Sequence, residues 1–171
     1  DINLKAVKTI TVKKPRKNIY LLDKAFNGTD LALYFYNTKE DRYELEAYDQ
    51  NLNKAGSAQV EHKLTNMEAA IIDQNLKNEN DGKESSGALG DIGLTPVPGK
   101  GFITNGILKN GKGYTLTMFD NSLKKKWNFE TSEDADEYEA YIISEATDKY
   151  LTGIVFRRKG MMSMKMSYYL V

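Results

Sequence analysis

The sequence predicts an all-β protein built from antiparallel repeats of four strands each. Apolar and polar residues alternate along much of the chain, which is the period of a strand with one covered face. Short polar breaks join successive strands into hairpins, and a shift of 71 residues lays one part of the chain on another. A chain of 171 residues is long enough for one domain, which we expect to span residues 1–171.

The first repeat, at about 19–60, begins with two apolar stretches and continues into an alternating one. We expect strands at 19–22, 31–36, 43–48 and 54–60. Tyr43, Leu45 and Ala47 alternate with Glu44 and Glu46, so one face of the third strand is apolar. The polar break at 37–41 separates it from the second strand and predicts a hairpin.

The second and third repeats follow the same order of elements. In the second, at about 69–131, we expect strands at 69–72, 102–108, 114–119 and 125–129. In the third, at about 140–171, we expect strands at 140–143, 151–156 and 162–171. Asn110-Gly111 is the strongest turn signal, because both residues tolerate the positive φ of a type I′ turn.

The repeat is carried by matching residues around an aspartate that closes the third strand. Residues 43–73 and 114–144 are identical at 9 of 31 positions, which include Asp49 with Leu52 and Asp120 with Leu123. An aspartate side chain accepts backbone N–H bonds from the residues that follow it and so fixes a turn. We therefore expect equivalent turns after both third strands.

Two segments leave an alternative open. Thr65 and Glu68 have the spacing of a capping box that would open a helix through Leu76, and 132–150 also has helix-like spacing. The two segments align with each other, so we expect either two strands or two helices, the latter giving βββα repeats. Paired isoleucines at 71–72 and 142–143 favour strands, since β-branched residues lose rotamer freedom in a helix. Pairing of the last strand with residues 7–12 into a small closed barrel is a further alternative.

The segment 74–101 breaks the pattern, because it is rich in glycine and its counterpart is about twenty residues shorter. Long loops of this kind are often functional or disordered. We expect an inserted loop that offers acidic and apolar groups to a partner. The candidate residues are Asp81, Glu84, Asp91, Leu94, Pro96, Val97 and Pro98.

Composition excludes several kinds of chemistry. The 24 basic and 24 acidic residues balance, so the chain lacks the positive field that attracts nucleic acid. The absence of cysteine excludes disulfides and thiolate sites. His62 is the single histidine, and its polar surroundings predict a surface residue. Neither Gly99-Lys100-Gly101 nor 73–84 has the spacing of a phosphate or calcium loop. We expect no catalytic residue, no metal and no cofactor.

Strands at this spacing, with Phe119-Asp120-Asn-Ser-Leu123 followed by Trp127, are similar to the blades of secreted bacterial β-propellers. The resemblance covers about 19–171 and implies propeller-type, blade-like sheets. A propeller closes with typically four to eight blades, so the resemblance implies an N-terminal fragment whose further blades come from the same or another chain. The first residue, Asp1, indicates removal of a leader, and we expect a secreted, periplasmic or cell-surface protein.

Two functions follow from this interpretation. The first is a non-enzymatic binding or scaffold module that recognises a protein or glycan partner, without nucleic acid and without a transmembrane segment. The second is a glycan hydrolase that uses carboxylates from several blades. Two carboxyl groups about 5 to 10 Å apart in one pocket would favour the hydrolase.

Overall fold

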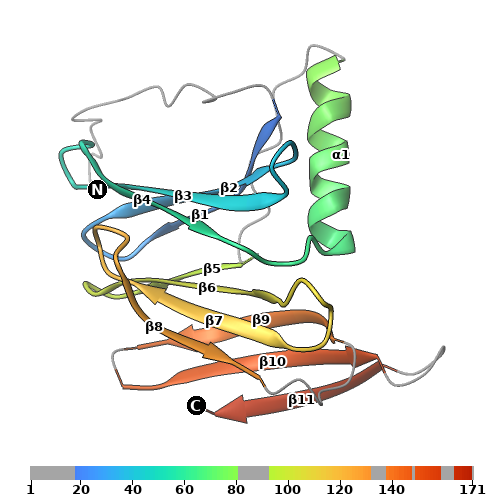
Figure 1. Cartoon of the computed structure of the whole chain (residues 1–171). Coiled ribbons are helices and arrows are strands. Elements are labelled where there is room, and N and C mark those ends of the chain that lie inside the picture. The colour runs from blue at the N-terminus through green and yellow to red at the C-terminus, as the bar shows by residue number, and fades with distance from the viewer. Residues whose placement is uncertain (1–17, 81–92, 132–137, 148, 159–163, 171) are drawn as a thin grey trace, which may run out of the picture.

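The computed structural model describes residues 18–80, 93–131, 138–147, 149–158 and 164–170. In this part of the chain, three antiparallel sheets are stacked one on another, and a single helix stands beside the first sheet (Figure 1). The all-β class and the antiparallel sheets of four strands are therefore confirmed. The sheets are not closed into a barrel, so that alternative is wrong for the described residues.

Sheet 1 contains the four strands expected at the start of the chain. They are β1 (Ile19–Phe26), β2 (Leu31–Asn37), β3 (Arg42–Tyr48) and β4 (Lys54–Val60), paired in sequence order. Tyr43, Leu45 and Ala47 of β3 are fully buried, whereas Glu44 and Glu46 between them are half-buried on the opposite face. The alternation in the sequence thus separates the core face of β3 from its polar face.

Sheet 2 consists of β5 (Leu94–Val97), β6 (Gly101–Ile107), β7 (Tyr114–Phe119) and β8 (Lys125–Glu130), again in sequence order. Three of its strands were expected, but the expected first strand at 69–72 is wrong. That segment lies within α1 (Asn66–Asn80). The capping box decides the outcome, because Thr65 and Glu68 satisfy the first free N–H groups of the helix and outweigh the preference of Ile71 and Ile72 for a strand.

The interpretation of 74–101 as one inserted loop is also wrong. Its beginning is the C-terminal part of α1, and β5 near its end is the first strand of sheet 2. β5 pairs with β6, where Leu94 lies opposite Thr104 and Val97 opposite Gly101. A deletion through this segment would therefore remove parts of the fold.

Sheet 3 contains β9 (Tyr138–Ala146), β10 (Leu151–Arg158) and β11 (Met164–Leu170), with β10 in the centre. Residues 142–143 are in a strand, whereas the aligned residues 71–72 are in a helix. The expectation that the two segments share one structure is therefore wrong, and the βββα alternative fails with it. Residues 7–12, 162–163 and 171 lie outside the described part of the chain.

Among the described residues two apolar cores lie between the sheets, and a third, smaller cluster of Ile19, Leu33 and Phe35 belongs to β1 and β2. The first lies between sheets 1 and 2 and takes in residues of both, such as Tyr34 and Phe102, together with Ile71 and Ile72 of α1. The second lies between sheets 2 and 3 and includes Leu116 and Ile143. Because α1 and all three sheets contribute, each sheet is fixed by its neighbour through buried apolar surface. No helix in the described ranges is long and apolar enough to cross a membrane.

The two aspartate turns are the closest match between expectation and structure. The carboxylate of Asp49 accepts N–H bonds from Asn51 and Asn53 at 2.8 and 2.9 Å, and that of Asp120 accepts them from Ser122 and Lys124 at 3.0 and 2.9 Å. In each turn the leucine has a positive φ, 61° at position 52 and 59° at position 123. Each carboxylate therefore stabilises a turn that leucine alone would adopt reluctantly.

Candidate functional site

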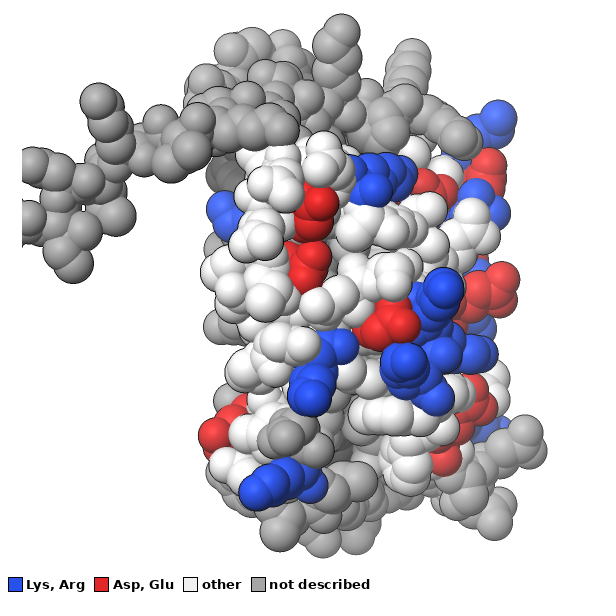
Figure 2. All heavy atoms as spheres, turned by 90° about the vertical axis from the view of Figure 1, so that its left-hand side faces the viewer, with Lys and Arg blue, Asp and Glu red and all other residues white. Residues whose placement is uncertain are grey.

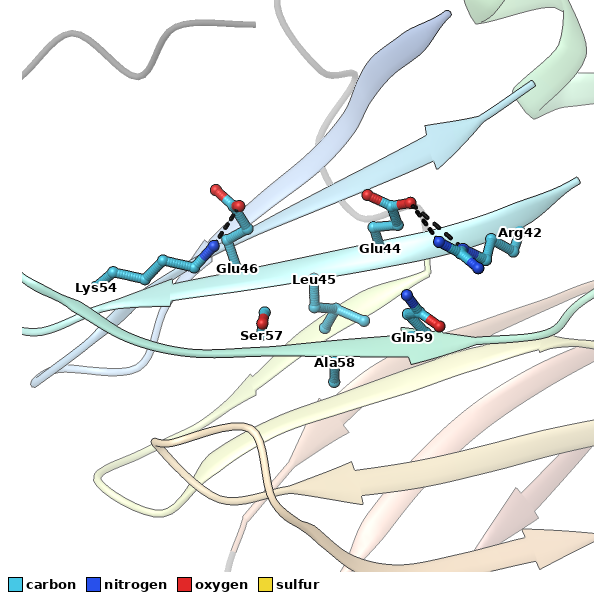
Figure 3. A pocket seen from close by; sticks show the side chains of 8 residues that line it. All are labelled: Arg42, Glu44, Leu45, Glu46, Lys54, Ser57, Ala58 and Gln59. Carbon is cyan, nitrogen blue, oxygen red and sulfur yellow. Dashed lines mark hydrogen bonds and ion pairs between the residues drawn. The ribbon is translucent and has the colours of Figure 1, made fainter. Parts of the chain in front are cut away.

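The outer face of sheet 1 carries a polar hollow of about 430 Å³. It lies over β3 and β4, on the face of the sheet opposite the core (Figure 3). We call it the β3–β4 hollow. Its lining residues are Arg42, Glu44, Leu45, Glu46, Lys54, Ser57, Ala58 and Gln59.

The period of two explains why these side chains gather there. On β3, Glu44 and Glu46 point away from the core, and Leu45 between them points into it (Figure 3). On β4, Ser57 lies opposite Glu46 and Gln59 lies opposite Glu44. Two neighbouring strands thus place two carboxylates, a hydroxyl and an amide on one surface.

Ion pairs fix the carboxylates at both ends of the hollow. Arg42 contacts Glu40 at 2.5 Å and Glu44 at 3.3 Å, and Lys54 contacts Glu46 at 2.5 Å. The hydroxyl of Tyr48 also donates to Glu46 at 2.7 Å. The carboxylate positions are therefore held by several contacts each.

The hydrogen bonds and ion pairs of the hollow also set the ionisation of Glu46. Partial burial raises the pKa of Glu46, but the hydrogen bonds from Lys54 and Tyr48 outweigh it and leave the pKa below its usual value. Glu46 is therefore ionised at neutral pH. Among the lining residues, the two carboxylates of Glu44 and Glu46 are balanced by the two cations Arg42 and Lys54, so the hollow has no formal net charge.

His62 was expected on the surface, and this prediction is wrong. Its side chain is 2% exposed and lies between sheets 1 and 2, with Nδ1 3.3 Å from the hydroxyl of Tyr34. The ring packs directly on Gly106 of β6, where any side chain would collide with it. Burial lowers the pKa of His62 to about 4, so the imidazole is neutral at physiological pH.

A second buried polar group, Glu68, shares a neighbour with this histidine, because both contact Tyr43. One of its carboxylate oxygens accepts hydrogen bonds from the hydroxyl of Tyr43 at 2.8 Å and from the backbone and hydroxyl of Thr65 at 2.8 and 2.7 Å. Burial raises the pKa of Glu68 and also that of Tyr43. These contacts join β3 to the first turn of α1, and they have a structural role because Tyr43 and Glu68 are buried.

Four of the residues predicted to contact a partner lie in the described part of the chain. Asp81, Glu84 and Asp91 lie outside the described residues. Leu94 and Val97 are 3% and 2% exposed and belong to the two cores, so their side chains are not free to dock. Pro96 is half-buried, and Pro98, in the β5–β6 turn, is exposed.

Side chains of both charges occur on the face of the stack that carries the hairpin turns. Figure 2 shows basic and acidic side chains interspersed on this face. For example, Lys126 at the start of β8 lies 3.4 Å from Asp120 in the turn between β7 and β8. No group of three or more possible metal-ligating side chains occurs among the described residues.

Comparison with known proteins identifies a family. The family model of DUF6770, a family of unknown function, matches residues 1–171, and the chain belongs to this family. No curated protein and no solved structure matches the chain.

Proposed function

We propose that this member of DUF6770 is a non-enzymatic binding or scaffold module whose partner is a protein or a glycan. The observation that carries the proposal is the β3–β4 hollow, a polar surface of about 430 Å³ with side chains held in place by ion pairs. Fixed polar groups in a concavity favour recognition, because little side-chain entropy is lost when a partner binds.

We now place the proposed binding surface at the β3–β4 hollow and no longer at residues 74–101. Two of the apolar residues predicted there, Leu94 and Val97, are buried in the cores. The β3–β4 hollow offers hydrogen-bonding groups instead, among them Ser57 and Gln59 on β4. Such groups suit the hydroxyls of a sugar or the polar atoms of a peptide.

One observation favours the glycan hydrolase as a second candidate. Glu44 and Glu46 line the same hollow, and alternate positions on a strand are roughly 7 Å apart, within the range of carboxyl pairs in glycosidases. A general acid, however, needs a raised pKa, and that of Glu46 is lowered. Each of the two carboxylates is also engaged in an ion pair, Glu44 with Arg42 and Glu46 with Lys54.

We further propose that the three sheets are blade-like units of a propeller-type repeat. Their face-to-face stacking and the equivalent turns at Asp49 and Asp120 support this assignment. A secreted, periplasmic or cell-surface location remains a prediction of the sequence.

A crosslinking experiment tests the proposed function. A photoreactive amino acid at position 59, in the hollow, is compared with one at position 130, which lies 71 residues further along on the exposed strand β8. An oligosaccharide array is probed in parallel with the wild type and with Ser57→Lys, which fills the hollow. We expect either a protein crosslinked from position 59 but not from 130, or a glycan whose binding Ser57→Lys abolishes.

Two results would contradict the proposal. The first is the absence of any partner, protein or glycan, that depends on the hollow. The second is hydrolysis of a glycoside panel that is lost in both Glu44→Gln and Glu46→Gln, which would assign the hollow to the hydrolase instead.

A further inference from the structure

We propose that Asn110, in the turn between β6 and β7, is a site of spontaneous modification, where the side-chain amide converts to aspartate or isoaspartate and the isoaspartate loosens the contact between sheets 1 and 2. The inference is independent of the proposed function. The chain has three Asn-Gly pairs, which begin at Asn27, Asn105 and Asn110. A glycine has no side chain to hinder the approach of its own nitrogen to the preceding asparagine.

The reaction needs only water besides the chain itself. The backbone nitrogen of Gly111 loses its proton and attacks Cγ of Asn110, so that an N–Cγ bond forms. The bond between Cγ and Nδ2 then breaks, and the leaving nitrogen takes up the proton and departs as ammonia. Water opens the resulting cyclic imide at either of its two carbonyls. One opening gives aspartate, and the other gives isoaspartate, in which the main chain runs through the former side-chain carbonyl.

The side chain of Asn110 is placed for this reaction. It is exposed, and its leaving nitrogen, Nδ2, makes no hydrogen bond within the described residues. Its Oδ1 accepts the backbone N–H of Lys112 at 2.9 Å. Negative charge develops on this oxygen when Gly111 attacks, so the N–H of Lys112 already points at the atom that it must stabilise.

Three lysines surround the pair. Lys109 and Lys112 flank it in the sequence, and Nζ of Lys63 is 3.2 Å from the point where a side chain at Gly111 would begin. A nearby charge of opposite sign favours the charged form of a group. These cations therefore favour both the deprotonated nitrogen that attacks and the carboxylate that results.

One backbone hydrogen bond opposes the attack. The N–H of Gly111 donates to the carbonyl of Leu108 at 2.7 Å, so the turn must open before the nitrogen can react. The next bond of the hairpin, from the N–H of Leu108 to the carbonyl of Gly113, can stay in place. Opening of a hairpin turn alone costs much less than opening of a packed sheet.

The other two asparagines are protected by the fold. Asn27 is 4% exposed, and its Nδ2 donates to the carbonyl of Gly101 at 3.3 Å and to Oδ1 of Asn121 at 3.0 Å. Its Oδ1 accepts the N–H of Asp30 at 2.9 Å. Asn105 is 7% exposed and belongs to β6, which is paired on both sides. Both can react only after sheet 2 separates from sheet 1 or loses a strand.

The modification matters because the turn also joins two sheets. Nζ of Lys109 donates to the backbone carbonyl of Asp41 at 2.7 Å and to its carboxylate at 3.0 Å, and Asp41 belongs to the turn between β2 and β3. Isoaspartate at position 110 adds one atom to the main chain beside Lys109. The lysine is then displaced from the turn of sheet 1.

Peptide mapping by mass spectrometry tests the inference on the whole 171-residue protein, incubated at mildly alkaline pH because base removes the proton of Gly111. We expect the peptide with Asn110 to convert about tenfold or more faster than those with Asn27 or Asn105, since the latter need larger opening. In guanidinium chloride, where no structure protects them, the three should convert at similar rates. Lys63→Met, which keeps the apolar stem without the charge, should slow conversion at Asn110.

Several results would overturn the assignment of the site. They are equal rates at the three pairs in the folded protein, the same ratio of rates in the folded and unfolded chains, and conversion of Asn110 only after unfolding. An unchanged rate in Lys63→Met would overturn the contribution of that cation.

The consequence for the fold has its own measurement. The isoaspartate form, separated from the aged protein by ion exchange, is compared in urea denaturation with Asn110→Asp, which has the same charge but an ordinary main chain. We expect a lower midpoint for the isoaspartate form. Equal midpoints would show that the added main-chain atom leaves the contact between Lys109 and Asp41 undisturbed and would overturn this part of the inference.

Discussion

Gly56 of β4 lies directly against the carbonyl oxygen of Ser122, which belongs to the turn between β7 and β8 of the next sheet. A Cβ at position 56 would collide with that oxygen, so the absence of a side chain allows the turn of sheet 2 to rest on sheet 1. At the position 71 residues further along, β8 has Trp127, which is 44% exposed. The two interfaces of the stack are therefore built differently at this point.

Gly56→Ala should lower the free energy of unfolding by about 1 to 3 kcal/mol, because the backbone of the turn must move to admit the methyl group. Urea denaturation provides the measurement. Ser57→Ala, at the exposed neighbouring position, should change stability by less than about 0.5 kcal/mol. Equal stability of Gly56→Ala and the wild type would show that the two sheets tolerate a wider separation.

His62 should make the protein less stable in acid. Its pKa is about 4 in the folded protein and 6.5 when unfolded, so the unfolded chain alone takes up this proton between those values. The free energy of unfolding should therefore fall as the pH drops from 6.5 to 4, by about 3 kcal/mol from this group.

The comparison that isolates this effect is His62→Gln, measured over the same pH range. Glu68 is present in both proteins, so its own titration cancels in the comparison. Because folding raises the pKa of Glu68, its contribution to stability is lost as the pH rises above the pKa of the unfolded state, which is opposite to the effect of His62. The difference between the two curves should shrink as the pH falls. Parallel curves would mean that His62 takes up its proton equally in both states.

Thr65→Ala should destabilise the protein by about 1 kcal/mol, since the hydroxyl caps the N-terminus of α1. This hydroxyl accepts the N–H of Glu68 at 3.3 Å and donates to its carboxylate at 2.7 Å. Thr65→Ser keeps the hydroxyl and should retain most of the stability. Helical circular dichroism during thermal unfolding reports both variants, and identical midpoints for alanine and serine would contradict the role of the cap.

Asp120→Ala should be more destabilising than Asp49→Ala. Each change removes a carboxylate that accepts two backbone N–H groups, at a cost of about 1 to 2 kcal/mol. The turn at Asp120 also presents Ser122 to Gly56, so its distortion disturbs the contact between two sheets. Chemical denaturation of both variants measures the difference, and a larger loss for Asp49→Ala would contradict this ranking.

The sequence predicted most strands because their alternation is local. The turns at Asp49 and Asp120 could be predicted equally well, since the same residue types occur in both turns 71 positions apart. β5 was missed because Pro96 argues against a strand. Proline is tolerated there because β5 pairs only with β6 and its other edge needs no N–H donor within the described sheet.

The polar residues were harder to place. His62 stands among charged residues, and its burial depends on Gly106, 44 positions away, together with the hydrogen bond from the N–H of Lys63 to the carbonyl of Ile107 at 2.8 Å. No local pattern contains that information. Glu44 and Glu46 were recognised as the polar face of a strand, but their ion pairs and the hollow follow from the register between β3 and β4.

The two separate apolar cores make the molecule a nearest-neighbour assembly, in which sheet 2 contributes to both interfaces while sheets 1 and 3 contribute to one each. In such a linear array, loss of an end unit costs one interface, whereas loss of the middle unit costs two. Opening should therefore begin at the ends and reach sheet 2 last. We therefore expect the amide hydrogens of β6 and β7 to exchange with solvent most slowly, because their exposure needs the rarest opening of the chain. The amide hydrogens of sheet 3 should exchange faster, through partial opening that occurs more often.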